Sequence, residues 1–161
     1  MAADRTYRRY NSRIHEVSDR VEKLEQLELK NEVNKLKTYS TFGENVKETK
    51  RKLLEFLITV KQEGKKIAGY GAPGKGNTLL NYCGIRTDFL DYTVDRSPFK
   101  QGKFLPGTHI PIYPPEKISE MRPDYLLILP WNLKDEIMKQ MAFVREWGGK
   151  FVVPIPELTV Y

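Results

Sequence analysis

The sequence has little cysteine and no long apolar run. Its single cysteine, Cys83, cannot form a disulfide framework or a cysteine-rich zinc site within the chain. No stretch approaches the ~20 apolar residues of a membrane span, and the segment that begins at Met1 lacks the apolar core of a signal peptide. We therefore expect Cys83 to be a buried thiol in a cytoplasmic protein that has no membrane partner.

Histidine is also scarce. His15 and His109 are the two histidines, and they lie far apart without metal-ligand spacing, so no metal site is predicted. The sequence contains no pattern of a Ser-His-Asp or Cys-His nucleophile, and no pair of carboxylates in a plausible cleft. We predict no catalytic residue in this chain.

The charge is the first feature that points to a partner. The chain carries a net charge of +6, with 27 Lys and Arg against 21 Asp and Glu. Such an excess suits nucleic acid or a phosphorylated small molecule. Much of it lies along helical segments where Lys and Glu alternate, which is typical of a solvated face. Because no aromatic–basic pattern of RNA-binding strands is present, we favour the small molecule and expect no nucleic-acid partner.

The order of apolar patterns predicts an α/β fold. Two amphipathic helices, within 18–37 and from about 42 to Gly64, precede strands expected at 65–70, 88–95, 109–113, 124–129 and 150–154. Strands that alternate with helices imply a mainly parallel sheet. The prediction is a Rossmann-like sheet of about five strands flanked by helices, with an N-terminal helical connector at 1–63 and the Rossmann-like domain at 64–161.

The first strand leads directly into a glycine-rich loop. In dinucleotide-binding folds one glycine permits a tight turn, a second admits a pyrophosphate to the backbone and a third lets the helix pack closely. We assign these places to Gly69, Gly71 and Gly74, and the following helix N-terminus favours an anion. The predicted phosphate- or nucleotide-binding residues are Gly69, Tyr70, Gly71, Ala72, Pro73, Gly74, Lys75, Gly76, Asn77 and Thr78.

The same loop comes close to a Walker A motif. Gly74 and Lys75 have the required spacing from Gly69, but Gly76 stands where Ser or Thr should coordinate magnesium. This argues against an NTPase. Lys75 either donates to a phosphate oxygen or is a solvated loop lysine.

The second predicted strand ends at another candidate pair. Asp95 follows the glycine loop by roughly the 20 residues at which such folds place an acceptor for a ribose hydroxyl. Arg96 is suited to a phosphate. The alternative is an ordinary Asp–Arg pair on the surface.

Other candidates lie on the carboxyl edge of the sheet, where open α/β sheets bind ligands. Trp131, after Pro130, either stacks on a base or sugar or packs on a helix, and Asn132 either contacts the ligand or caps the next helix. The long loop at 96–107 suggests a function, which makes Lys103 a candidate. His109 begins the next predicted strand and has either a pocket or a structural role.

These motifs together resemble the C-terminal domain of SAM-dependent sugar C-methyltransferases, which act on nucleotide-linked deoxysugars. Four segments carry the resemblance in the same order, at 69–85, 94–102, 106–111 and 129–133. It extends back into the helical connector through Glu28, Tyr39, Phe42 and Val46. Members of that family also have a zinc-binding N-terminal domain and a central SAM-binding domain with the catalytic base, and neither has a counterpart here.

The resemblance implies that the chain helps to hold a nucleoside-diphosphate sugar, for example one linked to dTDP, while a separate or missing domain transfers the methyl group. It implies SAM for the full-length family and no cofactor for this chain by itself. The chain is then either an excised domain or a separate subunit. Apolar surface left by the missing domain also makes a homodimer a reasonable expectation.

Two alternatives remain open. An NAD(P)-binding oxidoreductase domain is favoured by the glycine spacing and Asp95 but opposed by the lack of hydride-site residues. A scaffold or interaction domain without a ligand is the other, because fold resemblance does not guarantee an occupied site and the charged N-terminal helices are suited to a partner surface.

Overall fold

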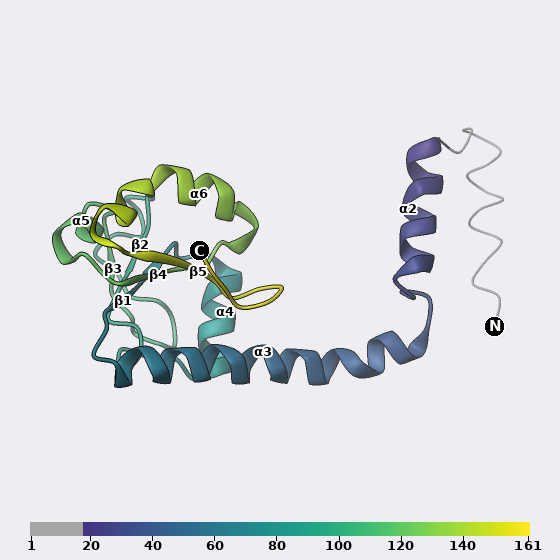
Figure 1. Cartoon of the computed structure of the whole chain (residues 1–161), viewed down its shortest axis with the longest axis horizontal. Helices are drawn as coiled ribbons and strands as arrows, with labels where there is room; N and C mark the ends of the chain where they lie inside the picture. Colours follow the sequence, from purple (N-terminus) through teal and green to yellow (C-terminus); the bar gives the residue numbers. More distant parts are fainter. Residues whose placement is uncertain (1–17) are drawn as a thin grey trace. The chain divides into compact units, whose positions relative to one another are not determined.

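The computed structural model describes residues 18–161 (Figure 1). Its contacts divide the chain into two compact units, Met1–Asn45 and Val46–Tyr161. His15 and the first part of the predicted connector lie outside the described residues. The predicted domain boundary at residue 63 remains a prediction.

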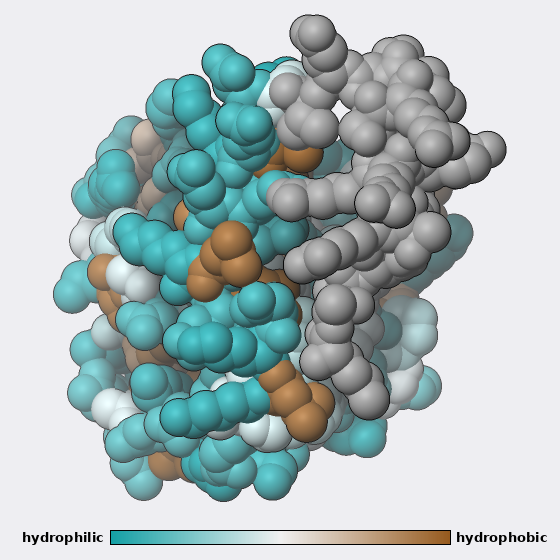
Figure 2. All heavy atoms as spheres, turned by 90° about the vertical axis from the view of Figure 1, so that its right-hand side faces the viewer, coloured by the Kyte–Doolittle hydropathy of each residue, from teal (hydrophilic) through white to brown (hydrophobic). Residues whose placement is uncertain are grey.

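The first helix is shorter than the sequence pattern predicts. Helix α2 (Asp19–Lys30) begins after Ser18, whose carbonyl accepts a 2.8 Å hydrogen bond from the Val21 N–H. It ends before residue 37 because the chain turns at Glu32, which adopts a φ of +56°. Among the residues that the structure describes, none of those in α2 is buried. Exposed apolar side chains appear as separate brown patches on an otherwise hydrophilic face (Figure 2).

Helix α3 (Leu36–Gln62) begins earlier than predicted and continues across the boundary between the two units. Within the second unit its apolar stripe is buried through Leu53, Leu57 and Val60, as the sequence spacing predicts. The helix ends as predicted at Gly64, where a φ of +68° lets the Lys65 N–H donate 3.0 Å to the Val60 carbonyl.

The second unit contains one sheet of six strands in the order β3-β2-β1-β4-β5-β6. The strands are β1 (Ile67–Tyr70), β2 (Thr93–Val94), β3 (Ile112–Tyr113), β4 (Tyr125–Ile128), β5 (Lys150–Val153) and β6 (Thr159–Val160). The first five are parallel, and β6 pairs antiparallel with β5. This is the strand order of a Rossmann fold, so the predicted fold class is confirmed, with one more strand than expected.

Helices cover both faces of the sheet (Figure 1). On one face, α3 and α4 (Gly74–Cys83) bury leucines against Ile67, and Cys83 is buried here as predicted. On the other face, α5 (Lys117–Met121), α6 (Lys134–Gln140) and the 3-10 helix η2 (Ala142–Trp147) pack around Tyr70 and Ile128. Residues Leu126 to Leu129 are fully buried, as expected of a strand covered on both sides.

Two predicted strands are shorter than expected. The second was predicted at 88–95, but the Leu90 N–H donates 2.9 Å back to the Arg86 carbonyl, and this turn leaves only Thr93–Val94 in the sheet. The third was predicted from His109, which instead lies in a turn with a φ of +58°. Within residues 18–161, no helix has the length and apolarity needed to cross a membrane.

Candidate functional site

The turn out of β1 is made by Gly71. Its φ of +87° lies in the left-handed region, and a Cβ there would come within 2.7 Å of the Pro130 side chain. The Gly71 N–H donates 2.6 Å to the Val94 carbonyl, and its own carbonyl accepts a 2.9 Å bond from the Thr93 hydroxyl. These contacts of Gly71 fix the glycine loop against β2 on one side and against Pro130, which follows β4, on the other.

The other two glycine roles fall at different positions from those predicted. We assigned the turn to Gly69, but this glycine makes room for Thr93, whose hydroxyl oxygen would lie 2.7 Å from a Cβ there. We assigned close helix packing to Gly74, yet a Cβ at Gly74 has nothing within 4 Å. A Cβ at Gly76 would lie 2.7 Å from Leu129 Cβ, so Gly76 is the packing glycine.

The N-terminus of α4 lies at the carboxyl edge of the sheet. The helix begins at Gly74 after Pro73, which makes no side-chain cap. The first N–H groups of a helix have no partner within it and carry a partial positive charge. The Thr78 hydroxyl donates 3.0 Å to the Gly74 carbonyl, and the buried Asn77 side-chain oxygen has no hydrogen-bond partner among the described residues. The arrangement favours an anion at Gly74–Gly76.

Asp95 lies directly beside this loop. One carboxylate oxygen accepts from the Ala72 N–H at 2.7 Å and from Lys100 Nζ at 3.1 Å, and the other accepts from the Ser97 N–H at 2.9 Å. Only 13% of the side chain is exposed. Asp95 thus ties the glycine loop to the loop after β2. Its predicted role as a ribose acceptor remains a prediction, since both oxygens already have partners in the protein.

The electrostatics of Asp95 follow from these contacts. Burial by itself would raise the pKa of the carboxyl group, because desolvation disfavours the charged form. The hydrogen bonds from Ser97, Ala72 and Lys100 outweigh burial, and the pKa of Asp95 lies below its ordinary value. The group is therefore a carboxylate whose charge is compensated within the protein.

The segment after β4 meets the glycine loop, as its position on the carboxyl edge predicted. Trp131 and Asn132 lie in the 3-10 helix η1 (Trp131–Leu133). Lys75 Nζ donates to the Asn132 side-chain oxygen and lies 4.6 Å from the centre of the Trp131 ring. The alternative that Asn132 caps a helix is wrong, because α6 follows Leu133 and has no side-chain cap.

The long loop places Lys103 and His109 elsewhere. Both side chains are exposed, and within the described part of the chain neither forms a hydrogen bond with the glycine loop. The loop is anchored to the far half of α4, where Asn81 donates 3.0 Å to the Pro106 carbonyl. Arg86 donates 2.8 Å to the Gly107 carbonyl nearby. The predicted pocket role of Lys103 and His109 remains a prediction.

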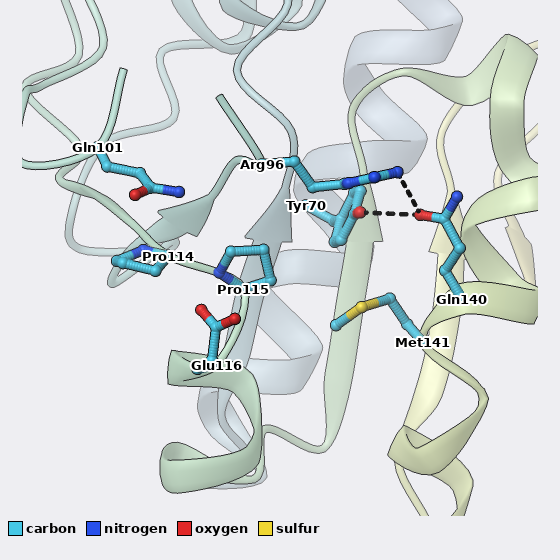
Figure 3. A pocket seen from close by; sticks show the side chains of 8 residues that line it. All are labelled: Tyr70, Arg96, Gln101, Pro114, Pro115, Glu116, Gln140 and Met141. Carbon is cyan, nitrogen blue, oxygen red and sulfur yellow. Dashed lines mark hydrogen bonds between the residues drawn. The ribbon is translucent and has the colours of Figure 1, made fainter. Parts of the chain in front are cut away.

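A cavity of about 580 Å³ opens at the carboxyl ends of β1, β2 and β3 (Figure 3). Sequence reasoning found two of its residues, Tyr70 and Arg96. It missed six others that come from separate segments: Gln101, Pro114, Pro115, Glu116, Gln140 and Met141. The position of residues 114–116 directly after a strand could have indicated their place at this edge, whereas no sequence signal marks Gln140 or Met141.

Gln140 is the polar centre of this cavity. Its side-chain oxygen accepts from the Tyr70 hydroxyl and from the Arg96 guanidinium, each at 3.4 Å, as Figure 3 shows. Its NH₂ group donates 2.6 Å to the Glu136 carboxylate, which fixes the orientation of the amide. Burial raises the pKa of Tyr70, so its hydroxyl is a neutral hydrogen-bond donor at physiological pH.

A second cavity of about 510 Å³ lies on the other side of η1. Trp131 and Asn132 line it together with residues of β5 and β6. Lys134 Nζ donates 2.7 Å to the Tyr161 hydroxyl here. The two cavities and the N-terminus of α4 make the carboxyl edge the candidate functional site.

Comparison with known proteins decides the family. The family described as the C-methyltransferase C-terminal domain matches residues 4–156. The chain belongs to this family. The resemblance seen in the sequence is thereby confirmed. This chain is 41% identical over 119 residues to the C-methyltransferase NovU of Streptomyces niveus, and the match covers 74% of the chain.

The same match covers only 28% of NovU, so this C-methyltransferase C-terminal domain spans less than a third of that relative. Among solved structures, UDP-D-quinovosamine 4-dehydrogenase from Vibrio fischeri matches 58% of this chain and 79% of its own, with a TM-score of 0.42 and 22% identity.

Proposed function

We propose that this C-methyltransferase C-terminal domain holds a nucleotide-linked sugar while a separate or missing domain transfers the methyl group. The observation that carries the proposal is the open N-terminus of α4 at the carboxyl edge, with the Lys75 ammonium beside it. Unpaired N–H groups, a helix dipole and a cation at one place are the elements of a diphosphate site.

In this proposal, the diphosphate accepts hydrogen bonds from the backbone N–H groups of Gly74–Gly76. Lys75 leaves its contact with Asn132 and donates to a phosphate oxygen, which returns more energy because the acceptor is charged. Arg96 lines the neighbouring cavity and donates to Gln140, so Lys75 is the cation of the proposed diphosphate site. The sugar then projects over η1, where Trp131 and Asn132 lie.

The domain that transfers the methyl group is a further part of the proposal. Val21, Leu24 and Leu27 are three residues apart on α2 and are each about half exposed, so this helix presents an apolar stripe to a partner. A domain of the same polypeptide, a separate subunit or a second copy of the chain would cover it. We propose a cytoplasmic location for the assembly.

Neither SAM nor NAD(P) fits the glycine loop well. Both have an adenosine ribose that needs an acceptor at the end of β2. Three of the four lone pairs of the Asp95 carboxylate already accept from Ala72, Lys100 and Ser97, which leaves one for a ribose hydroxyl. The described residues therefore give little support for a SAM site. For the same reason the geometry does not favour an oxidoreductase domain.

Calorimetric titration with dTDP tests the proposed diphosphate site through Lys75. We expect Lys75→Ala to weaken dTDP binding by about tenfold, the value of one charge-assisted hydrogen bond. The matched control is Lys150→Ala, which removes an exposed lysine at the amino end of β5, the opposite edge of the sheet, and should leave the affinity unchanged. Equal affinities of the wild type and Lys75→Ala would contradict the proposal.

A further inference from the structure

The cavity beside Tyr70 has a different chemistry from the N-terminus of α4. Its lining contains one cation, Arg96, and one anion, Glu116, together with the amides of Gln101 and Gln140. A phosphate site would gather positive charge, whereas a carboxylate at the rim repels an anion. The lining therefore suits an uncharged ligand with several hydrogen-bonding groups.

The cavity walls suit a flat ring. Pro114 and Pro115 form one side and the buried Met141 lies on the other, as Figure 3 shows. Proline rings have little conformational freedom to lose, and a methionine side chain adapts to a ring placed against it. A volume of about 580 Å³ lies within the range of small-ligand pockets.

The polar groups around these walls are held in place before any ligand arrives. Glu136 orients the Gln140 amide at 2.6 Å, and the Gln101 NH₂ group donates 2.9 Å to the Asp95 carbonyl. By contrast, the Tyr70 and Arg96 bonds to Gln140 are long, at 3.4 Å. These two donors can turn to a ligand at little cost.

The cavity also lies within reach of the diphosphate site. Tyr70 lines the cavity and directly precedes Gly71, and α4 begins at Gly74. Four residues span at most about 14 Å at ~3.5 Å per residue, so one ligand of moderate length can touch both places. The two sites therefore offer consecutive subsites along the same edge.

From these observations we propose that the cavity lined by Tyr70, Glu116 and Gln140 binds the nucleoside end of the ligand, a base with its ribose. The inference rests on the proposed function, since that function supplies the diphosphate that continues to α4. In the bound state the base lies between the prolines and Met141. Gln140 and Gln101 face its polar edge, and Glu116 accepts from a ribose hydroxyl or a base N–H.

Nuclear magnetic resonance separates the two subsites without altering the protein. The side-chain NH₂ signals of Gln140 and Gln101 report on the cavity, and the backbone N–H signals of Gly74 and Gly76 report on the helix N-terminus. Thymidine, which has no phosphate, should shift the glutamine signals, and pyrophosphate should shift the glycine signals. If thymidine shifts neither glutamine signal but dTDP shifts the glycine signals, the nucleoside subsite is overturned and the diphosphate site is not.

Variants supply the energetic test. Gln140→Leu keeps the size of an exposed side chain, so folding is not at risk, and it should weaken dTDP by about tenfold while leaving pyrophosphate unchanged. Gln62→Leu, at the exposed end of α3, is the matched control and should change neither. An unchanged dTDP affinity in Gln140→Leu contradicts the nucleoside subsite. If the wild type binds none of thymidine, pyrophosphate and dTDP, the proposed function fails and the subsite with it.

Comparison of nucleotides then identifies the base. dTDP, UDP and ADP share the diphosphate, so a difference in their affinities arises at the cavity. We expect at least a tenfold spread among the three for wild-type protein, and a smaller spread for Gln140→Leu. Equal affinities for all three in the wild type would show that the cavity does not read the base and would overturn the inference.

Discussion

The Asp95 carboxylate holds the glycine loop by accepting a 2.7 Å hydrogen bond from the Ala72 N–H. This contact joins the end of β2 to the turn between β1 and α4. Lys100 and the Ser97 N–H complete the set of donors around the carboxylate. Asp95 is therefore a positioning residue for the loop on which the proposed phosphate site depends.

Replacement of Asp95 should destabilise the fold. Asp95→Asn removes the charge and places an NH₂ group beside a backbone N–H, and we expect the free energy of unfolding to fall by about 1–3 kcal/mol. Asp91→Asn is the matched control, because Asp91 forms a largely exposed ion pair with Lys61 and should cost less than about 1 kcal/mol. Urea denaturation measures both, and equal losses would contradict the positioning role.

The same carboxylate should make stability depend on acid pH. The pKa of Asp95 in the folded state lies below the ordinary 3.8, so the folded protein binds this proton less readily than the unfolded chain. Its contribution is complete above pH 3.8 and is lost as the pH falls through the folded-state pKa. The stability difference between the wild type and Asp95→Asn should shrink between pH 4 and pH 2. A constant difference would count against the assignment.

Two neighbouring glycines should respond oppositely to alanine. Gly76→Ala places a Cβ 2.7 Å from Leu129 Cβ and should lower the free energy of unfolding by about 1–3 kcal/mol through overpacking. Gly74→Ala meets open space and should be neutral or slightly stabilising, since alanine is the better helix residue. Thermal unfolding of the two variants distinguishes them. Similar melting temperatures would show that Gly76 is not the packing glycine.

Tyr92 carries a buried hydroxyl that has no hydrogen-bond partner in the described residues. Burial is the main cause that raises the pKa of Tyr92 to about 12. Tyr92→Phe should therefore keep or raise the free energy of unfolding by about 1 kcal/mol, because it removes an unsatisfied polar group. In the wild type, the free energy of unfolding should decline between pH 10 and pH 12, because the Tyr92 hydroxyl loses its proton more readily in the unfolded chain than in the folded protein. Destabilisation by Tyr92→Phe would indicate an unseen partner.

Local patterns in the sequence predicted much of this fold. The glycine loop was predicted from the order of strand, turn and helix. The end of α3 at Gly64 was predicted from the position of this glycine after an amphipathic stripe. The buried strand β4 was evident from its continuous apolar run. Such features depend on residues close in sequence, which is why the pattern alone predicts them.

Features that depend on tertiary contacts were missed or misassigned. The roles of Gly69 and Gly76 depend on Thr93 in β2 and on Leu129, which directly follows β4. Strand β6 is two residues long and exposed, so it has no apolar pattern to reveal it. Gln140 enters the candidate site because α6 packs beside β1, a relation that no local spacing encodes.

Calorimetric titration of the wild-type chain with dTDP, NAD and SAM, side by side, tests whether the carboxyl edge holds a nucleotide-linked sugar. We expect dTDP to bind and NAD and SAM not to bind, because the α4 N-terminus takes a diphosphate while three of the four Asp95 lone pairs are already used by Ala72, Lys100 and Ser97. Binding of NAD or SAM, or no binding of dTDP, would contradict this expectation.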